Sequence, residues 1–382
     1  MALGLDHASR RPEGMTDRSL NLVLVSTPVG QLGSGRGGGV ELTLASLVKG
    51  LVKRGHRLQL VAPEGSCSPV ADGRVTLHPV PGVDQPSWQH ADRDASIQIP
   101  ENAVLPRLWD RALDLVSGVD ALVNFGYDWL PLWLTRHVEA RIFHLVSMGS
   151  VSAVMDQAVA DVARWDQRRL AFHTRRQADD FALVEPPEVV GNGFDLSRYD
   201  LQLSADGPLG WAGRVAPEKG LEDAAAVAAL LGERLRVWGL VEDHDYAKRV
   251  ESAVPAGTIE WCGFKPTAEL QRELGSCRAL LNTPKWNEAY GNVVVEALAC
   301  GVPVIAYDRG GPGEIIQNGQ TGWLVPPDDR EALAEATVRV AAIDRHACRH
   351  WVEQCASQEG LAARVEAWIR RGLTPADGTI SR

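Results

Sequence analysis

The chain has 382 residues, more than one ordinary hydrophobic core accommodates, so two domains are expected. Its formal net charge of −10 opposes contact with a nucleic-acid backbone, and no block of lysine and arginine interrupts that acidity. No apolar run reaches the roughly 18–20 residues of a membrane-spanning helix, and residues 1–19 lack the apolar centre of a signal peptide. We therefore expect a cytoplasmic protein with no nucleic-acid partner and no stable membrane anchor.

The first half of the chain predicts one α/β domain. Residues 21–26 are a buried-strand run, residues 40–53 have helical spacing that ends at Gly55, and residues 57–62 form the next strand. This alternation predicts a Rossmann-like domain over residues 20–183. Its further strands are expected at residues 75–80, 121–125, 141–147 and 171–174.

The alternation restarts after a crossing rich in proline and glycine at residues 184–207. The second half predicts another Rossmann-like domain, over residues 184–359, with a helix at residues 221–231. Two doubly wound sheets in tandem leave a cleft between them. The strands of this second domain are expected at residues 209–211, 235–239, 258–263, 278–282 and 302–307.

The two ends of the chain lie outside this alternation. Residues 1–19 are expected to form a disordered tail. Residues 360–382 are expected to form a final helix, from about Gly360 to Arg371, followed by a loose tail.

The cysteines indicate no metal site and no disulfide frame. They show no C-x-x-C pair and no paired ligand spacing, so reduced thiols are expected. They are Cys67, Cys262, Cys277, Cys300, Cys348 and Cys355.

The segment with the most chemical information is residues 286–296, with the sequence WNEAYGNVVVE. Gly291 lets the backbone turn closely, Asn292 is expected to cap the helix that follows, and the amides after it present unpaired N–H groups to a diphosphate. Glu296, one turn inside the helix, suits the vicinal hydroxyls of a ribose, and Glu288 suits a second sugar. The spacing therefore indicates a nucleotide-sugar site.

Arg214 and Lys219 are the candidate cations for a leaving diphosphate. They follow a predicted strand and precede a predicted helix, at the carboxyl edge where α/β sheets bind ligands. Two cations meet the charge of a diphosphate without a metal ion. The alternative is that both are ordinary surface charges.

The same segments resemble glycosyltransferase family 4. Glu288 and Glu296 stand at the E-x7-E spacing of retaining glycosyltransferases, and the likeness covers most of residues 20–335. It implies two Rossmann-like domains facing a cleft, the GT-B arrangement, with the last helix packing back on the first domain. The other matching segments are GRVAPEKG at residues 213–220, EALACGVPV at 296–304, GGPGEII at 310–316 and GQTGWLV at 319–325.

A glycine-rich segment at residues 33–39 contains a G-x-G-x-x-G match. It begins well beyond the end of its strand, and no acidic residue follows at the distance a dinucleotide ribose requires, so NAD or FAD binding is disfavoured. An unspecific flexible loop is a second alternative. Resemblance to the family implies instead that bare backbone at Gly38 and Gly39 approaches the donor phosphate and that Glu41 faces the acceptor.

Two D-x-D tripeptides, at residues 92–94 and 243–245, match the metal-binding motif of the other large glycosyltransferase class. Such tripeptides often arise by chance, and the second is expected to be a solvated helix start. No metal and no cofactor are therefore expected.

Several side chains of the first domain are candidates for the reacting sugar and the acceptor. His144 lies in an apolar strand, where a lone histidine is usually a core residue, but the family resemblance implies that it faces the reacting sugar. Asp128 follows the end of a strand and is a candidate to bind the acceptor or to act as a base. The alternative is that it is a solvated turn residue. Trp129 and Trp286 are expected at cleft edges where an aromatic acceptor stacks, with Met148 nearby.

These motifs assign roles to individual residues. Catalysis is assigned to His144, Glu288, Arg214 and Lys219; donor binding to Gly38, Gly39, Arg214, Lys219, Phe264, Asn292, Val293 and Glu296; and acceptor binding to Glu41, Asp128, Trp129 and Met148. Phe264, after a predicted strand, is the candidate contact for the base.

The expected function is metal-independent, retaining transfer of a hexose from a nucleotide diphosphate sugar to a small acceptor. Residues 25–44, 125–131 and 144–150 resemble the cyanobacterial UDP-glucose:tetrahydrobiopterin glucosyltransferases. That resemblance implies UDP-glucose as co-substrate and the side-chain hydroxyl of a reduced pterin as acceptor. The resemblance favours displacement on the same face of the sugar. The residues alone also leave open a route through a covalent intermediate.

Three alternatives remain open. One is a family 4 transferase acting on another small molecule or a cell-surface glycan. The second is a sugar-nucleotide epimerase of similar architecture, and the third is a non-enzymatic nucleotide-sugar sensor. The sequence predicts no particular oligomeric state.

Overall fold

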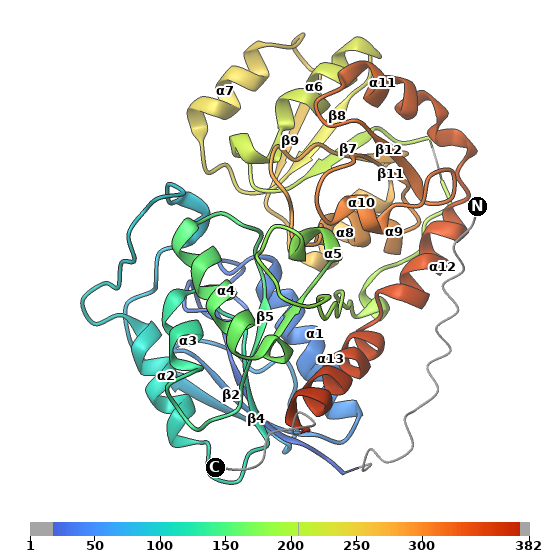
Figure 1. Ribbon diagram of the computed structural model, residues 1–382. Coiled ribbons are helices and arrows are strands. Elements are labelled where there is room, and N and C mark those ends of the chain that lie inside the picture. Colours follow the sequence, from blue (N-terminus) through green and yellow to red (C-terminus); the bar gives the residue numbers. More distant parts are fainter. Residues whose placement is uncertain (1–17, 205, 375–382) are drawn as a thin grey trace.

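The computed structural model describes residues 18–204 and 206–374. The tail expected at residues 1–19 lies outside the described residues up to residue 17, and so does the tail after residue 374. Two parallel six-stranded sheets form two α/β domains (Figure 1). The predicted fold class is therefore confirmed.

The first sheet has the strand order β3-β2-β1-β4-β5-β6, and every neighbouring pair is parallel. The order reverses between β1 and β4, which creates a switch point at their carboxyl ends. The strands are β1 (Asn21–Val25), β2 (Arg57–Pro63), β3 (Val75–Val80), β4 (Ala121–Asn124), β5 (Ile142–Val146) and β6 (Leu170–Phe172). The helices are α1 (Gly39–Lys53), α2 (Val104–Asp114), α3 (Trp129–Leu134), α4 (Ala153–Asp166) and α5 (Arg175–Ala178).

The second sheet repeats this plan with the order β12-β11-β10-β7-β8-β9, and its switch point lies between β7 and β10. The strands are β7 (Leu209–Ala212), β8 (Leu235–Trp238), β9 (Ile259–Gly263), β10 (Ala279–Asn282), β11 (Val304–Tyr307) and β12 (Gly322–Val325). The helices are α6 (Leu221–Leu230), α7 (His244–Ser252), α8 (Thr267–Gly275), α9 (Asn292–Ala299), α10 (Pro312–Ile315), α11 (Arg330–Arg339), α12 (Arg345–Cys355) and α13 (Gln358–Leu373).

All strands expected from the sequence are present, and β12 is an additional one. It is a four-residue strand, GWLV, at the edge of its sheet, and two of its residues are half-buried. The family-like segment at residues 319–325 contains it, but it is not among the strands expected from the sequence.

Strand β1 shows why a parallel strand reads as one apolar run. Leu22 and Leu24 face the cluster that contains α1, while Val23 and Val25 face the cluster that contains α2. Both faces of the sheet are covered by helices, so polar residues have no solvated face to occupy.

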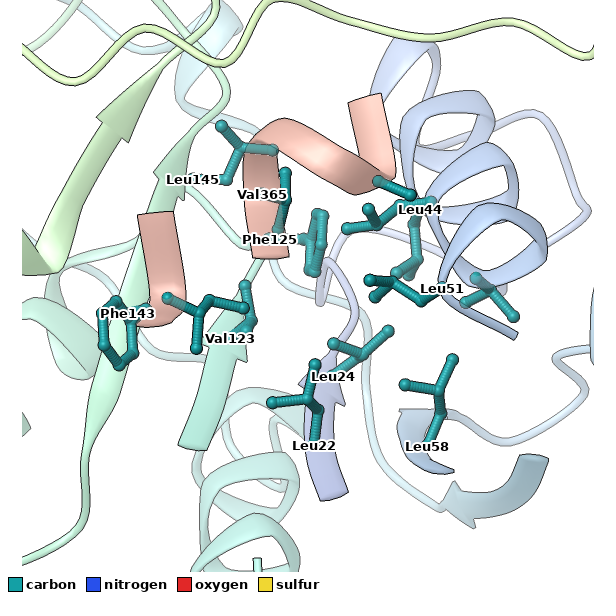
Figure 2. Packing of buried hydrophobic residues seen from close by; sticks show 14 of the residues in the cluster. Leu22, Leu24, Leu44, Leu51, Leu58, Val123, Phe125, Phe143, Leu145 and Val365 are labelled. Carbon is teal, nitrogen blue, oxygen red and sulfur yellow. The ribbon is translucent and has the colours of Figure 1, made fainter. Parts of the chain in front are cut away.

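The last helix, α13, packs on the first domain beside α1 (Figure 1). Figure 2 shows Val365 of this helix among the side chains of Phe125 and Leu145, which come from the first sheet and its edge. The two helices approach closely at Gly50, where a Cβ would lie 2.7 Å from the Cβ of Ala362. The chain therefore completes the core of its first domain with its last helix.

Trp368 is the largest side chain that α13 adds to this core. It is 1% exposed, its ring meets Phe143 edge-on at 5.3 Å, and its indole N–H donates to the carbonyl of Arg168 at 2.9 Å. A buried indole with its N–H satisfied contributes both apolar area and a hydrogen bond.

We predict that Trp368→Ala destabilises the first domain by about 3–5 kcal/mol, because it leaves a cavity and an unpaired carbonyl. Chemical denaturation followed by circular dichroism measures this change. Trp165→Ala is the matched control, because Trp165 is 49% exposed and should cost less than about 1 kcal/mol. Equal losses in the two variants would contradict the assigned role of α13.

Candidate active site

The carboxyl ends of both sheets face the boundary between the domains (Figure 1). The glycine-rich segment between β1 and α1 meets the start of α9, since the side-chain amide of Asn292 donates to the carbonyl of Gly39 at 3.4 Å. Asn192, in the crossing between the domains, donates to the amide oxygen of Asn292 at 2.8 Å. The two switch points are thereby brought together, and this is where doubly wound sheets bind ligands.

Glu41 holds the glycine-rich segment in place. Its carboxylate accepts backbone N–H bonds from Gly33 at 2.7 Å, Gly35 at 3.1 Å and Gly37 at 2.6 Å, and the residue is 5% exposed. The expectation that Glu41 faces the acceptor is corrected here, because both carboxylate oxygens are engaged by the loop. Glu41 instead fixes the shape of the backbone that precedes α1.

Gly38 and Gly39 present bare backbone at the domain boundary. Gly38 has φ 61° and ψ −136°, a backbone conformation that residues other than glycine rarely adopt. A Cβ on Gly39 would lie 2.5 Å from the side-chain nitrogen of Asn292. A side chain at residue 39 would therefore displace the amide of Asn292, and the unpaired amides at the start of α1 lie in the same place.

The start of α9 differs from expectation at Asn292. Gly291, with φ 99°, is the residue before the helix, and no side chain caps the first turn. Asn292 is already helical, and its amide bridges to Asn192 and Gly39 across the domain boundary. The predicted capping role is thus wrong, and the first amides of α9, at Asn292 and Val293, keep N–H groups without intrahelical acceptors.

Glu288 and Lys219 form an ion pair in which Glu288 is buried and Lys219 is partly exposed. Glu288 is 8% exposed, and the indole N–H of Trp286 donates to the same carboxylate at 3.3 Å. The Lys219 ammonium lies 4.8 Å from the centre of the Trp286 ring. Burial favours the neutral acid, but Lys219, Trp286 and the charge of Arg214 outweigh it and hold the pKa of Glu288 below its ordinary value, so it stays ionised.

Arg214 and Lys219 lie on the loop after β7, as the sequence predicts. Arg214 pairs with Glu218 at 2.9 Å and with Glu242 at 2.5 Å. The loop passes close to β10 at Gly220, where φ is 65° and a Cβ would lie 2.0 Å from the carbonyl oxygen of Thr283. The structure thus brings both cations beside the loop that carries Glu288, and Glu218 and Glu242 are partners that sequence reasoning missed.

Glu296 is 7% exposed and accepts a hydrogen bond from the Tyr199 hydroxyl at 3.0 Å. Burial raises the pKa of Glu296 to about 7, although Tyr199 and Arg198 counteract it. Tyr199 was not predicted as a site residue. It lies 97 positions away in the chain, and no motif marks it.

His144 does not face the cleft. It is 1% exposed, its Nδ1 lies 3.1 Å from the amide nitrogen of Asn124, and its Nε2 lies 2.6 Å from the hydroxyl of Thr135. Burial and the charge of Arg169 lower its pKa to about 3. The expectation that His144 faces the reacting sugar is corrected for a geometric reason: it lies two residues before the end of β5, inside the sheet rather than at its carboxyl edge.

Asp128, Trp129 and Met148 lie around one apolar cluster of the first domain. Asp128 is 1% exposed and accepts the backbone N–H of Trp129 at 2.8 Å, and burial raises its pKa to about 6. Trp129 stacks on Trp133 at 5.6 Å, and both Trp129 and Met148 pack against the cluster while remaining half-buried. Asp128 is thus a helix cap in this arrangement, not a solvated turn residue.

Phe264 lies across the domain boundary from the glycine-rich segment. It is 55% exposed, and a Cβ on Gly35 would lie 3.5 Å from the tip of its ring. An exposed aromatic side chain at this place is available to stack on a flat ligand.

Beside Trp286, the domain boundary encloses a pocket of about 390 Å³. None of its polar residues was singled out by the sequence. Its lining consists of Arg93, Ser150, Val151, Asp180, Trp286 and Asn287.

Within residues 18–374, apart from residue 205, no group of three or more His, Cys, Asp or Glu side chains is arranged to hold a metal ion. Asp243 caps α7 by accepting a hydrogen bond from the backbone N–H of Tyr246, as expected of a helix start.

All six cysteines are free. Over the same described residues, no helix has the length and apolar character needed to cross a bilayer.

Residues 209–369 match the family model described as Glycosyl transferases group 1. This segment runs from β7 into α13 and includes Arg214, Lys219, Glu288 and Glu296. The match thus covers the second domain and less than half of the whole chain.

Curated relatives and solved structures show further similarity to this chain. A D-inositol 3-phosphate glycosyltransferase of Rhodococcus erythropolis is 27% identical over 93% of this chain and 91% of its own length. A sucrose synthase of Acidithiobacillus caldus is 34% identical over 30% of this chain, but this match spans only 15% of that longer protein. The Anabaena protein HepE, solved in complex with UDP and glucose, has a TM-score of 0.68 at 17% identity and covers 91% of this chain and 98% of its own. The overall fold is thus that of GT-B glycosyltransferases.

We predict that Tyr199→Phe raises the pKa of Glu296 further, by about one pH unit or more, because the variant lacks the hydroxyl that stabilises the carboxylate. Infrared difference titration against Glu296→Gln measures this pKa. An unchanged or lower pKa in Tyr199→Phe would contradict the inferred contact.

Proposed function

We propose that this chain, a glycosyltransferase of group 1 by its C-terminal domain, transfers glucose from UDP-glucose to a small acceptor with retention and without a metal ion. The observation that carries the proposal is the contact between Gly39 and Asn292, the first residues of α1 and α9, together with the ion pair between Lys219 and Glu288, which precedes α9 in the chain. Helix starts and cations together form a site for a diphosphate.

The diphosphate is proposed to lie between the backbone of Gly38 and Gly39 and the first amides of α9. Positive dipole ends and unpaired N–H groups attract it from both sides. Arg214 and Lys219 supply the charge that a metal ion supplies in other transferases. In the free protein their carboxylate partners neutralise them, so an incoming diphosphate competes with Glu218 and Glu242 for Arg214.

The two glutamates are proposed to hold the two sugars of the donor. Glu296, one turn inside α9, accepts from the ribose hydroxyls, and Glu288 accepts from the hydroxyls of glucose because it remains ionised. Phe264 is the proposed contact for the base, since its exposed ring lies beside the glycine-rich segment.

The transfer itself is proposed as a same-face displacement. The bond between the anomeric carbon and the β-phosphate oxygen breaks, and a bond from the acceptor oxygen to that carbon forms on the same face. The acceptor's hydroxyl proton passes to the departing phosphate oxygen, so no protein nucleophile is needed. The protein contributes position and electrostatic stabilisation of the departing UDP.

Two findings support the choice of donor and acceptor. HepE, which shares this fold, was solved with UDP and glucose, and the Rhodococcus erythropolis relative is named for D-inositol 3-phosphate. The proposed acceptor, a reduced pterin with a side-chain hydroxyl, rests on the resemblance in residues 25–44, 125–131 and 144–150. Another small hydroxylated molecule is the second candidate.

Measuring UDP release from UDP-glucose tests the proposal. Reactions without acceptor, with tetrahydrobiopterin and with a few free sugars are compared in the presence of EDTA, and product masses are determined. A pterin that gains one hexose supports the donor, the acceptor and metal independence together. Acceptor-independent release or an isomerised sugar would indicate hydrolysis or epimerisation, and tight binding without release would indicate a sensor.

We predict that Lys219→Ala lowers turnover by about 10²–10³-fold, because it removes a cation that stabilises the departing diphosphate. Lys219→Arg should retain part of the rate, since it keeps the charge. Steady-state UDP release measures both, and thermal melting establishes that each variant is folded. Lys248→Ala is the control, because its side chain is 79% exposed. Wild-type turnover in Lys219→Ala would overturn the site assignment.

We predict that UDP affinity rises as the pH increases through about 7, because Glu296 must be ionised to accept two ribose hydroxyls. The nearby Tyr199 and Cys300 have raised pKa values and do not titrate between pH 6 and 8, and the other charge beside Glu296 is Arg198. Calorimetric titration of UDP into the wild type and Glu296→Gln measures the effect. Glu296→Gln should bind more weakly and lack this step, with the titration of UDP common to both proteins.

Identical affinities and pH profiles for the wild type and Glu296→Gln would contradict the ribose assignment. Loss of affinity in Glu296→Gln without any change in the profile would place Glu296 at the donor but contradict the role of its ionisation.

A further inference from the structure

The loop that carries Glu288 is bound by the first domain on both sides of that residue. On one side, the side-chain amide of Asn287 donates to the two carboxylate oxygens of Asp180, at 3.1 and 3.3 Å. On the other side, the hydroxyl of Thr174 donates to the backbone carbonyl of Ala289 at 2.9 Å. Glu288 thus belongs to the second domain, but the residues before and after it in the chain are held by the first.

The hydroxyl of Thr174 has a fixed direction. Thr174 is 2% exposed and immediately precedes α5, where its oxygen accepts the backbone N–H of Gln177 at 3.1 Å as the cap of that helix. Its hydrogen is left to donate to Ala289. A buried hydroxyl that is engaged as both donor and acceptor has little freedom to turn, so it fixes the carbonyl that it binds.

Helix α10 joins α5 to the same loop across the domain boundary (Figure 1). The carboxylate of Glu314 in α10 accepts the backbone N–H groups of Arg175, at 3.2 Å, and Arg176, which are the first two residues of α5. The backbone N–H of Gly311, just before α10, donates to the carbonyl of Glu288 at 2.7 Å. The start of α5 and the loop of Glu288 are thus held by the same segment of the second domain.

Two glycines allow these segments to approach closely. A Cβ on Gly313 would lie 1.9 Å from a guanidinium nitrogen of Arg176, which pairs with Asp308. A Cβ on Gly149, in the turn after β5, would lie 2.8 Å from the carbonyl oxygen of Asn287. The loop therefore has no room to shift toward the first domain.

The two oxygens of the Glu288 carboxylate are used differently. Lys219 and the indole N–H of Trp286 both bind Oε1. Among residues 18–204 and 206–374, no group donates a hydrogen bond to Oε2, which leaves this atom for the sugar hydroxyls that Glu288 is proposed to bind. The direction of Oε2 depends on the backbone of the loop, and Thr174 holds that backbone at Ala289.

We propose that Thr174 is a positioning residue for the transfer, and that it places Glu288 against the donor sugar through the carbonyl of Ala289. Asp180 acts on the same loop through Asn287. The inference rests on the proposed function and deepens it, because it names the contacts by which the first domain controls the donor glutamate of the second. A sugar-binding group that is misplaced by about 1 Å can lower the rate by on the order of 10²-fold.

The test measures the affinities for UDP and for UDP-glucose separately, by calorimetric titration. Thr174→Val removes the hydroxyl at nearly constant volume, and Thr174→Ser keeps it. Thr337→Val is the matched control, because Thr337 is 0% exposed and its hydroxyl donates to the carbonyl of Leu333 within α11. Asn287→Ala breaks the other contact and leaves the cap of α5 intact, so it tests the inference even if Thr174→Val does not fold.

We expect Thr174→Val and Asn287→Ala each to weaken UDP-glucose binding by about tenfold, because Glu288 no longer meets the glucose hydroxyls. UDP affinity should stay at the wild-type value, since α9, which provides the amides for the diphosphate, is anchored by its own buried residues. Thr174→Ser and Thr337→Val should bind both ligands as the wild type does. In the Glu288→Gln background, Thr174→Val should cause no further loss.

Wild-type affinity for UDP-glucose in Thr174→Val or in Asn287→Ala would overturn the inference. So would an equal loss of affinity for UDP and UDP-glucose, a defect in Thr174→Ser that matches the defect in Thr174→Val, or a further loss in the Glu288→Gln background.

The same titrations separate this inference from the proposed function. A wild type that binds neither ligand, or a Glu288→Gln variant that binds UDP-glucose normally, would refute the proposed function and this inference with it. Weaker UDP-glucose binding in Glu288→Gln together with normal binding in Thr174→Val would refute the inference alone.

Discussion

The contact between Asn292 and Gly39 is the constraint on which the rest of the site depends. It joins the start of α9 to the start of α1, and a side chain at residue 39 would displace the amide of Asn292 from it. On one side of the contact, the Glu41 carboxylate accepts hydrogen bonds from the glycine-rich segment and fixes its shape. On the other side, Asn192 donates a hydrogen bond to the side-chain amide of Asn292 and orients it. Two helix starts thus meet at the domain boundary, where the proposed diphosphate site lies.

The charges around this contact are balanced in the free protein. Lys219 pairs with Glu288, and Arg214 pairs with Glu218 and Glu242. Both cations are only partly exposed, so these carboxylates offset the cost of holding them in place before an anion arrives. The same pairs keep Glu288 ionised despite its burial, which leaves it an acceptor for sugar hydroxyls.

The sequence predicts the fold well because each sheet is buried on both faces, so its central strands appear as apolar runs. Lys219 and Glu288, which the sequence assigns to the site by separate motifs, lie together because each follows a strand at one switch point. The sequence does not predict the position of a side chain when that position depends on a contact with a residue far away in the chain. His144 lies two residues before the end of its strand and is therefore inside the sheet. The Glu41 carboxylate binds the loop that precedes its own helix, and Tyr199, 97 positions away in the chain, donates to Glu296. Spacing along the chain does not determine such choices.

The most direct test of the central claim is a crystal structure of the protein with UDP. The account predicts that the diphosphate lies between the backbone of Gly38 and Gly39 and the first amides of α9, within reach of Arg214 and Lys219, and that the ribose hydroxyls bond to Glu296. A diphosphate bound elsewhere, or a ribose that does not contact Glu296, would contradict the account.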